Sequence, residues 1–564
     1  MKPKNKWKVL PPIETNDNMG FDAHIDKALH ILNTSETDDV FLRRDIRHDA
    51  KNLNDIDVAW ARLDQVKNND EKVLVYGDYD VDGMTSTTIM AEGLQHYGID
   101  TSYVVPDRML DGYGPSDRLY KAALENGFSV IITTDNGISG APIIDKYSAL
   151  GLDVIVTDHH EPNGDMIPTK AIAKVHPMLS PKYEFNGLSG AGVAYKFITY
   201  KMPELKEDLE PLAAMGLIAD VMPLIDENRR IVYEGLTLLS TTKRPGLKAL
   251  KQVKNINDAN ITSDSIGFGL GPMLNSIGRI SDPMIGVNLL MSTDSGQAEA
   301  LSENVNQLNE KRKSMISSLT DEALSQAKSQ DAKHQILLVG GSDEVWHQGI
   351  VGIVAAKVSE VMKKPTLAMS FKEGSDGENV VHGSARSVPG YDIFQCMKSA
   401  EDTFITMGGH SGAAGFGLYQ KDINQLQNQL DAYVENHPLP SSTPETKVMD
   451  RIEVKDATVE FYDELQKLAP FGEQNPNPIW GLEFDHIANV SQMSGGTHVK
   501  FKGFDKDGNR LEVVGFSKGA DYDALCEIEK AGTRFFVVGT LGLNVFRGNK
   551  TAQLLVVDWG DDFS

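Results

Sequence analysis

Acidic side chains crowd the segment from Gly77 to Gly83, where Asp78, Asp80 and Asp82 occupy alternate positions. Three carboxylates this close repel one another unless cations offset their charge. The segment therefore predicts a cation site. An EF-hand calcium loop is set aside, because that loop needs a preceding helix and a bidentate glutamate at its twelfth position, whereas residues 72–76 have the pattern of a buried strand.

Three further segments carry carboxylate or imidazole groups, each directly after a predicted strand or an apolar run. They contain Asp135, the run Asp158-His159-His160, and Asp220. One such Asp is more often a helix cap, but four segments together favour a shared site. Carboxylate and imidazole ligands without thiolates suit Mn²⁺ or Mg²⁺.

The elements that must position these residues alternate between strand and helix. Strands are expected over residues 72–76, 129–134 and 154–157, with a helix over 84–97. This alternation predicts a parallel sheet with helices on both faces. Open α/β sheets bind ligands at the carboxyl ends of their strands, so all four segments are expected at one edge.

The second half of the chain has a different pattern. Residues 297–335 contain no Gly or Pro and predict one long helix, or two, between domains. A second α/β unit follows, with a strand at 335–339, a helix at 351–362 and a strand at 365–371. A Pro-rich linker spans 437–444, and short strands such as 498–502 and 534–538 then predict a small β-barrel. We expect an α/β multidomain fold with these units: N-terminal extension 1–60, catalytic domain 61–235, connector with the long helix 236–334, second α/β domain 335–440, and barrel 447–564.

Composition sets broad limits. The 564 residues are too many for one core, and the net charge is −25. Such a charge argues against a protein that coats nucleic acid through bulk charge, but not against a nuclease, whose cations offset its acidic site. The two cysteines, the lack of a long apolar run and the lack of a signal segment predict a cytoplasmic protein without membrane contact.

The four acidic segments resemble the motifs of the DHH phosphoesterase superfamily, and nearly the whole chain resembles the bacterial RecJ exonuclease family. Further segments fit that family: Gly112-Tyr-Gly114 with Arg118, residues 187–194, Leu274-Asn-Ser-Ile-Gly-Arg279, Ser384-Ala-Arg-Ser387, residues 408–415 and residues 470–476. In its terms, residues 335–440 are the DHH-associated domain and the barrel is an OB-like domain.

The resemblance implies a single-strand-specific 5′→3′ DNA exonuclease that uses two Mn²⁺ or Mg²⁺ ions to release 5′-mononucleotides in recombination and repair. Asp80 and Asp135 would hold one ion, with Asp135 bridging. Asp82, Asp135, His159 and Asp220 would hold the other.

The family pattern also implies roles for groups outside the metal shell. Asp158 would orient a histidine ring, and His160 would contact the scissile phosphate or assist proton transfer. Arg386 and His410 would add phosphate contacts as part of the catalytic set. The implied substrate-binding residues are Asn275, Arg279, Ser384, Arg386, Ser387, Gly409 and His410.

Two positions depart from the family pattern. Tyr76 stands where a histidine ligand is expected, so the first metal would rely on Asp78 instead. Met273 stands where we expect an arginine, which removes one candidate phosphate contact.

The barrel would bind a single strand through base stacking and backbone charge. Its candidate residues are Phe501, Phe504, Phe516 and Phe546, with Lys500, Lys502, Lys518 and Arg547 nearby. An aromatic residue in a barrel more often packs in the core than stacks on a base. By resemblance, the partners would be single-stranded DNA, a single-strand-binding protein and a RecQ-type helicase.

Two other functions compete with this one. A phosphodiesterase for short oligoribonucleotides or cyclic dinucleotides would share the four segments, but such relatives usually lack the C-terminal barrel. A non-catalytic scaffold would have lost the acids, and every carboxylate is present here.

Overall fold

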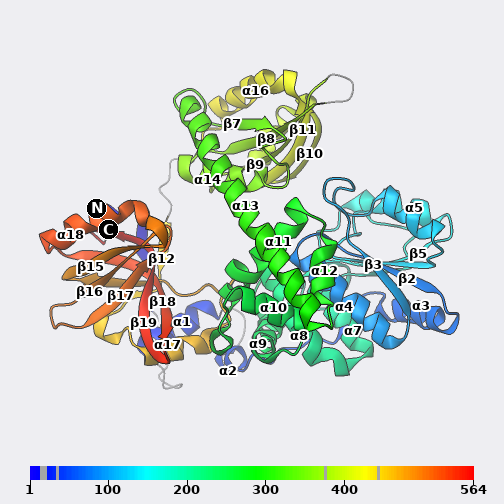
Figure 1. The fold of residues 1–564 in the computed structure, drawn as a ribbon, viewed down its shortest axis with the longest axis horizontal. Helices are drawn as coiled ribbons and strands as arrows, with labels where there is room; N and C mark the ends of the chain where they lie inside the picture. The colour runs from blue at the N-terminus through cyan, green and yellow to red at the C-terminus, as the bar shows by residue number, and fades with distance from the viewer. Residues whose placement is uncertain (13–21, 34–36, 374–377, 441–444, 564) are drawn as a thin grey trace.

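Three bodies make up the molecule in Figure 1: an α/β body on the right, a second α/β body at the top and a β-rich body on the left. The computed structural model describes residues 1–12, 22–33, 37–373, 378–440 and 445–563. Within these residues, no helix combines the length and the apolar character needed to span a bilayer.

The right-hand body is built on a five-stranded parallel sheet with the order β3-β2-β4-β5-β6. Its strands are β2 (Lys72–Tyr76), β3 (Asp100–Val104), β4 (Val130–Thr134), β5 (Asp153–Thr157) and β6 (Ala173–Val175). Tyr76 is paired with Thr133, and Thr134 with Thr157, so neighbouring strands end at the same level. The segments that follow β2, β4 and β5 therefore start from one edge.

Helices cover both faces of this sheet, as the sequence predicted. Val73 and Val75 pack into one apolar core and Leu74 and Tyr76 into another, because alternate residues of a strand face opposite sides. The helices are α3 (Ile56–Asn68), α4 (Val81–Tyr97), α5 (Asp117–Glu125), α6 (Ala141–Ser148), α7 (Gly190–Lys201), α8 (Lys206–Ala219), α9 (Asp226–Thr241), α10 (Pro245–Val253), α11 (Gly271–Ile280) and α12 (Met284–Leu290).

One helix, α13 (Ser295–Gln330), connects the two α/β bodies over 36 residues. Near its start, Ala298 and Val305 pack in the core of the right-hand body. Near its end, Leu319 and Ala323 pack in the upper body. A single helix anchored in two cores fixes the spacing between them.

The upper body contains a mixed five-stranded sheet with the order β10-β11-β9-β8-β7. Only the β7–β8 pair is parallel. Its elements are β7 (Leu337–Ser342), α14 (Val351–Met362), β8 (Thr366–Lys372), β9 (Val380–Arg386), α15 (Ile393–Lys398), β10 (Phe404–His410), β11 (Ala413–Tyr419) and α16 (Ile423–Asn436).

The left-hand body is a seven-stranded sheet with the order β13-β14-β18-β19-β17-β16-β15. Its elements are β13 (Asp450–Arg451), α17 (Val459–Leu465), β14 (Trp480–Phe484), β15 (His486–Met493), β16 (His498–Phe504), β17 (Arg510–Gly515), α18 (Tyr522–Ala531), β18 (Phe535–Phe546) and β19 (Asn549–Gly560). Part of the predicted linker before it, residues 441–444, lies outside the described residues.

The N-terminal segment also belongs to the left-hand body. β1 (Lys6–Val9) pairs in parallel with β12 (Glu445–Val448). Side chains of α1 (Ala23–Leu32) and of α2 (Asp38–Arg43) lie in the same apolar core as Trp480 and Phe501. The stretch expected as one extension, residues 1–60, is thus divided, because α3 packs on the right-hand sheet.

Candidate active site

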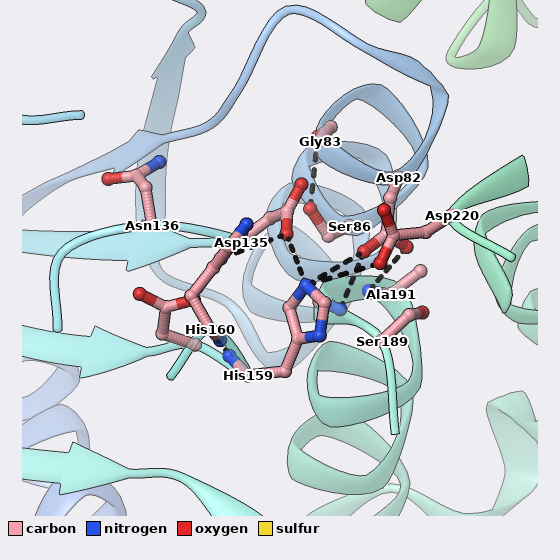
Figure 2. A network of polar contacts seen from close by, with 12 residues as sticks. Asp82, Gly83, Ser86, Asp135, Asn136, His159, His160, Ser189, Ala191 and Asp220 are labelled. Carbon is pink, nitrogen blue, oxygen red and sulfur yellow. Dashed lines mark hydrogen bonds and ion pairs between the residues drawn. The ribbon is translucent and has the colours of Figure 1, made fainter. Parts of the chain in front are cut away.

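Acidic and imidazole groups from four segments converge at the carboxyl edge of the parallel sheet. Three triads could each hold a metal ion, with ligand atoms within 4.8 Å of one another: Asp78, Asp80 and Asp135; Asp82, His159 and Asp220; and Asp135, His159 and His160. Figure 2 shows Asp82, Asp135 and Asp220 pointing toward the His159 ring. Asp135 belongs to two triads, which is the arrangement expected of a bridging ligand.

Backbone amides hold Asp82 in place. Its Oδ2 accepts a hydrogen bond from Gly190 N at 2.6 Å, and its Oδ1 accepts one from Ala191 N at 3.0 Å. These amides begin α7, where the helix dipole favours negative charge. A Cβ on Gly216 would lie 2.2 Å from Asp82 Oδ1, so only glycine there leaves room for the carboxylate.

Asp135 sits in a constrained backbone conformation directly after β4. Its φ is +63°, in the left-handed region that few non-glycine residues occupy. Its side chain is buried against Gly190, where a Cβ would lie 2.4 Å from the Asp135 Cβ. Strained residues persist where the surrounding structure fixes them, and here that residue belongs to two of the three triads.

Several buried polar atoms of the cluster have no hydrogen-bond partner among the described residues. They are Asp78 Oδ1, Asp135 Oδ1 and His159 Nε2. Burial and then the charge of Asp82 raise the pKa of Asp135, and burial and then Asp80 raise that of Asp78. Unpartnered oxygen and imidazole nitrogen atoms in an electronegative site fit hard divalent cations such as Mn²⁺ or Mg²⁺.

His160 and Asp158 form a separate pair beside the triads. His160 Nδ1 lies 2.8 Å from Asp158 Oδ1, and Asp158 also accepts a hydrogen bond from Ile138 N at 2.9 Å. Burial is the largest influence and opposes charging of both groups, but their hydrogen bond and the opposite charges around them together outweigh it. The pKa of Asp158 is lowered to about 2 and that of His160 is raised to about 9. The Tyr113 hydroxyl lies 3.1 Å from His160 Nε2.

Tyr76 takes no part in the cluster. Its ring is fully buried in the core on the α5 side, and its hydroxyl donates to the Gly114 carbonyl at 2.8 Å. Asp78 completes the triad with Asp80 and Asp135, which supports the expectation that the first metal would rely on Asp78.

Three arginines line a pocket of about 280 Å³ between the two α/β bodies: Arg108, Arg279 and Arg386. Burial and then the charges of Arg108, Arg312 and Arg386 lower the pKa of Arg279 to about 10. Converging guanidinium groups favour an anion. Ser384 also lines the pocket, and its hydroxyl accepts a hydrogen bond from Arg386 at 2.7 Å.

The remaining predicted substrate contacts lie away from this lining. Asn275 Oδ1 accepts a hydrogen bond from Val81 N at 3.1 Å, which positions the start of α4. Ser387 donates its hydroxyl to the Tyr391 carbonyl. His410 is exposed, and its Nδ1 accepts from Gly412 N at 3.2 Å; Gly409 precedes it at the exposed end of β10. Met273 is buried in the main core, so its position does not face the pocket.

Sequence reasoning missed several residues that line the pocket. Tyr79, Arg108, His382 and Phe416 come from four separate segments. Arg108 lies over the Tyr79 ring at 5.1 Å. Arg108 and Tyr113 lie in the loop after β3, which also contains Gly112 and Gly114. This glycine pair was the sequence feature that pointed to the loop.

The barrel candidates separate into core and surface residues. Phe501 is 1% exposed, so this candidate stacking residue belongs to the core instead. Phe504 is stacked on His486 at 4.9 Å, while Phe516 and Phe546 are 54% and 65% exposed. Lys500 and Lys502 lie on the same outer face of β16 as Phe504. Lys518 is partly buried, and Arg547 lies over the Phe546 ring at the tip of the β18–β19 hairpin.

Family models match all three bodies. Residues 72–222 match the DHH family, N-terminal domain, residues 332–436 match the DHHA1 domain, and residues 450–558 match the RecJ OB domain.

Individual proteins match over most of the chain. The single-stranded-DNA-specific exonuclease RecJ of Bacillus subtilis is 35% identical over 96% of this chain, which spans 66% of that protein's length. The Salmonella typhimurium protein of the same name is 31% identical, over 90% of each chain. The crystal structure of RecJ with Mn²⁺ from Thermus thermophilus superimposes with a TM-score of 0.80 at 25% identity, covering 98% of this chain and 79% of that one.

Proposed function

The chain belongs to the RecJ family, and from that premise we propose that it is a single-strand-specific 5′→3′ DNA exonuclease releasing 5′-mononucleotides by two-metal hydrolysis. The observation that carries the proposal is the position of the metal triads beside a pocket lined by Arg108, Arg279 and Arg386. Side chains that can bind metal ions lie next to guanidinium groups that can bind an anion. This arrangement suits a substrate whose phosphates must be both held and cleaved.

We assign the metal ligands from the triads. Asp78, Asp80 and Asp135 would hold one ion, and Asp82, His159 and Asp220, with Asp135 shared, would hold the other. Two ions held there would lower the pKa of a bound water and would stabilise the charge that develops on the phosphate during in-line displacement.

His160 would act on the substrate from beside the metal ligands. Its raised pKa keeps the imidazole protonated near neutrality, so it would donate a hydrogen bond to a phosphate oxygen. Asp158 is a positioning residue, because it holds His160 Nδ1 and keeps the ring against the Tyr113 hydroxyl.

The arginine pocket would hold a phosphate at the 5′ end of the strand. Arg279 is fixed by a hydrogen bond from its Nη1 to the Gly349 carbonyl at 3.1 Å, and Arg386 by Ser384. These bonds orient the guanidinium groups before substrate arrives, which reduces the entropy cost of binding. For His410, at the exposed end of β10, we keep the proposed phosphate contact.

The outer face of β16 would bind the strand beyond the cleavage site. Phe504, with His486 stacked on it, and Phe516, with His498 against its edge at 5.3 Å, offer aromatic groups next to Lys500 and Lys502. This combination of aromatic and basic groups suits sequence-independent binding of single strands.

The cellular setting is part of the proposal. We place the enzyme in the cytoplasm, in DNA recombination and repair, with a single-strand-binding protein and a RecQ-type helicase as partners that expose its substrate. Both Cys396 and Cys526 are free thiols, which suits a reducing compartment.

Product analysis tests the proposed activity. Single strands labelled at the 5′ or 3′ end are incubated with Mn²⁺ or Mg²⁺, and mononucleotides are expected from the 5′ end, with a matching duplex left intact. Cleavage restricted to di- and trinucleotides would instead assign the small-substrate phosphodiesterase function.

A further inference from the structure

A row of lysines follows the N-terminal strand. Lys2, Lys4, Lys6 and Lys8 occupy alternate positions, and all four side chains are exposed. Lys6 and Lys8 lie in β1, where alternate residues face the same side, and Trp7 between them is buried on the opposite side. Lys2 and Lys4 precede the strand and add two exposed positive charges to the same end of the left-hand body.

The backbone beneath this row is fixed. Buried Asp558 Oδ2 accepts hydrogen bonds from Lys4 N at 2.9 Å, from Asn5 N at 3.0 Å and from Trp7 Nε1 at 2.9 Å. β1 also pairs with β12, which places Lys8 opposite Lys447. The ammonium groups are thus presented from a rigid support, and the Lys4 and Lys8 side chains are each 61% exposed.

Acidic side chains lie near three of the four lysines. Lys4 Nζ lies 3.2 Å from Asp521, and Lys8 Nζ lies 3.6 Å from Glu445. Asp561 lies near Lys2. Exposed pairs of this kind contribute little, so a phosphate can replace the carboxylate at small cost. In a chain of net charge −25, this concentration of lysines is unusual.

Lys518 lies between Lys4 and the start of β16. Burial lowers the pKa of Lys518, and the nearby charge of Lys4 lowers it further. The residue before Lys518, Ser517, donates its backbone N–H to His498 Nδ1 at 3.0 Å, at the start of β16. Lys518 is therefore near both Lys4 and the strand that carries Lys500 and Lys502.

We propose that Lys2, Lys4, Lys6 and Lys8 form a second binding surface for the phosphate backbone of a long single strand, an inference that rests on the proposed function. Lys6 and Lys8, as alternate residues of β1, lie about 6.6 Å apart, from a rise of about 3.3 Å per residue. The surface would contact long strands without taking part in cleavage.

The test compares two variants of equal charge. In the first, Lys2, Lys4, Lys6 and Lys8 are all changed to Gln. In the control, four exposed lysines of the right-hand body are changed to Gln: Lys121, Lys170, Lys182 and Lys206. Binding is measured by fluorescence anisotropy, without divalent metal, to oligonucleotides of about 8 and about 40 nucleotides, since one OB domain occludes about 4–16.

The expected change is confined to the long strand. Loss of four phosphate contacts should make the slope of log affinity against log salt shallower by about 2.8, that is about 0.7 for each contact. The short strand and the control variant should keep the wild-type slope. Replacing the same four lysines with Arg should restore binding, which excludes a folding defect.

Two results would overturn the inference: an unchanged slope for the row variant on the long strand, or an equal loss in the control variant. Failure of the wild-type protein to bind either oligonucleotide would instead contradict the proposed function, so the two failures are distinguishable.

Discussion

Asp135 Oδ1 and His159 Nε2 lie 3.1 Å apart, and neither atom has a hydrogen-bond partner among the described residues. Two buried polar atoms left in this state carry a desolvation cost of about 1–3 kcal/mol each. A cation bound to both atoms removes that cost, so the site is organised for occupancy by metal.

Changing Asp135 to Asn should abolish nuclease activity, with a loss of more than about 100-fold. Substituting even a residue that only hydrogen-bonds to a metal ligand lowers activity or metal affinity about 10–100-fold. The fold should persist, because the amide fits the same space and relieves repulsion from Asp82. Turnover on 5′-phosphorylated single strands is the measurement. Unchanged turnover would contradict the bridging role.

Added Mn²⁺ should raise the melting temperature of the wild-type protein. At a concentration of 100 times Kd, one site contributes about 2.7 kcal/mol to the free energy of unfolding. The melting temperature of the Asp135→Asn variant should rise much less on adding Mn²⁺, because both proposed sites lose a ligand. An equal gain in both proteins would place the ions elsewhere.

Changing Arg279 to Gln should weaken action on strands with a 5′-phosphate more than on strands with a 5′-hydroxyl. A hydrogen bond to a charged group is worth about 1.5–3 kcal/mol, so kcat/KM should fall about 10- to 100-fold on the phosphorylated strand. Arg47→Gln is the control, since Arg47 pairs with Glu234 on the surface. Equal losses on both strands would argue against end recognition.

Two phenylalanines on β16 should behave in opposite ways. Phe504→Ala should weaken binding of long single strands by the stacking term of about 1–3 kcal/mol, with little effect on stability. Phe501→Ala should instead destabilise the fold by about 3–5 kcal/mol, because its ring fills the barrel core. Strand affinity and thermal melting of each variant separate these roles.

Stability should depend on pH through Glu210. Glu210 and Glu234 share Arg230, whose Nη1 lies 2.7 Å from Glu210 Oε1, and burial raises the pKa of Glu210 to about 7 from its ordinary value of 4.5. The native state then binds more protons between these values, so this contribution is complete below pH 4.5 and is lost as pH rises through 7.

Glu210→Gln should remove that dependence. The melting temperature of the wild type relative to the variant should be highest near pH 5 and should fall toward pH 8. Glu125→Gln, at an exposed position on α5, is the control. A difference that stays constant across this range would assign Glu210 an ordinary pKa in the folded protein.

The cluster of acidic and imidazole residues could be predicted because the strands that precede these residues are encoded by short-range sequence patterns. Strand β2 and helix α14 have the bounds that the sequence indicated, since runs of buried β-branched residues and apolar helical repeats are short-range signals. Acidic segments after parallel strands must meet at one edge of the sheet. The convergence of the segments after β2, β4 and β5 follows from this topology, whereas Asp220 ends helix α8 and reaches the site through helix packing.

The arginine pocket and the N-terminal pairing could not be predicted in the same way. The pocket gathers Arg108, Arg279 and Arg386 from a loop, a helix and a strand of two bodies, and no spacing in the sequence encodes that meeting. By contrast, Phe501 shares its side of β16 with Val499, and Phe504 shares the other side with Lys500 and Lys502, so the alternation itself indicates that Phe501 is the buried one.

The division of the N-terminal segment changes how the barrel domain should be removed in experiments. Deleting residues from Lys447 onward would uncover Ile25, Leu29 and Phe41, which lie in the barrel core. Loss of strand binding after such a deletion could then reflect aggregation. Substitutions on the outer face of β16 avoid that problem.

The same pairing affects how the protein is made. Arg44 Nε donates to the Ala469 carbonyl at 2.8 Å, across 425 residues of chain. At a synthesis rate of about 5–20 residues per second, the apolar side of α1 and α2 leaves the ribosome about 20–85 s before the strands that cover it. During that interval the nascent chain presents an uncovered apolar helix, so we expect its yield in cells to depend on chaperones that bind the first fifty residues while translation continues.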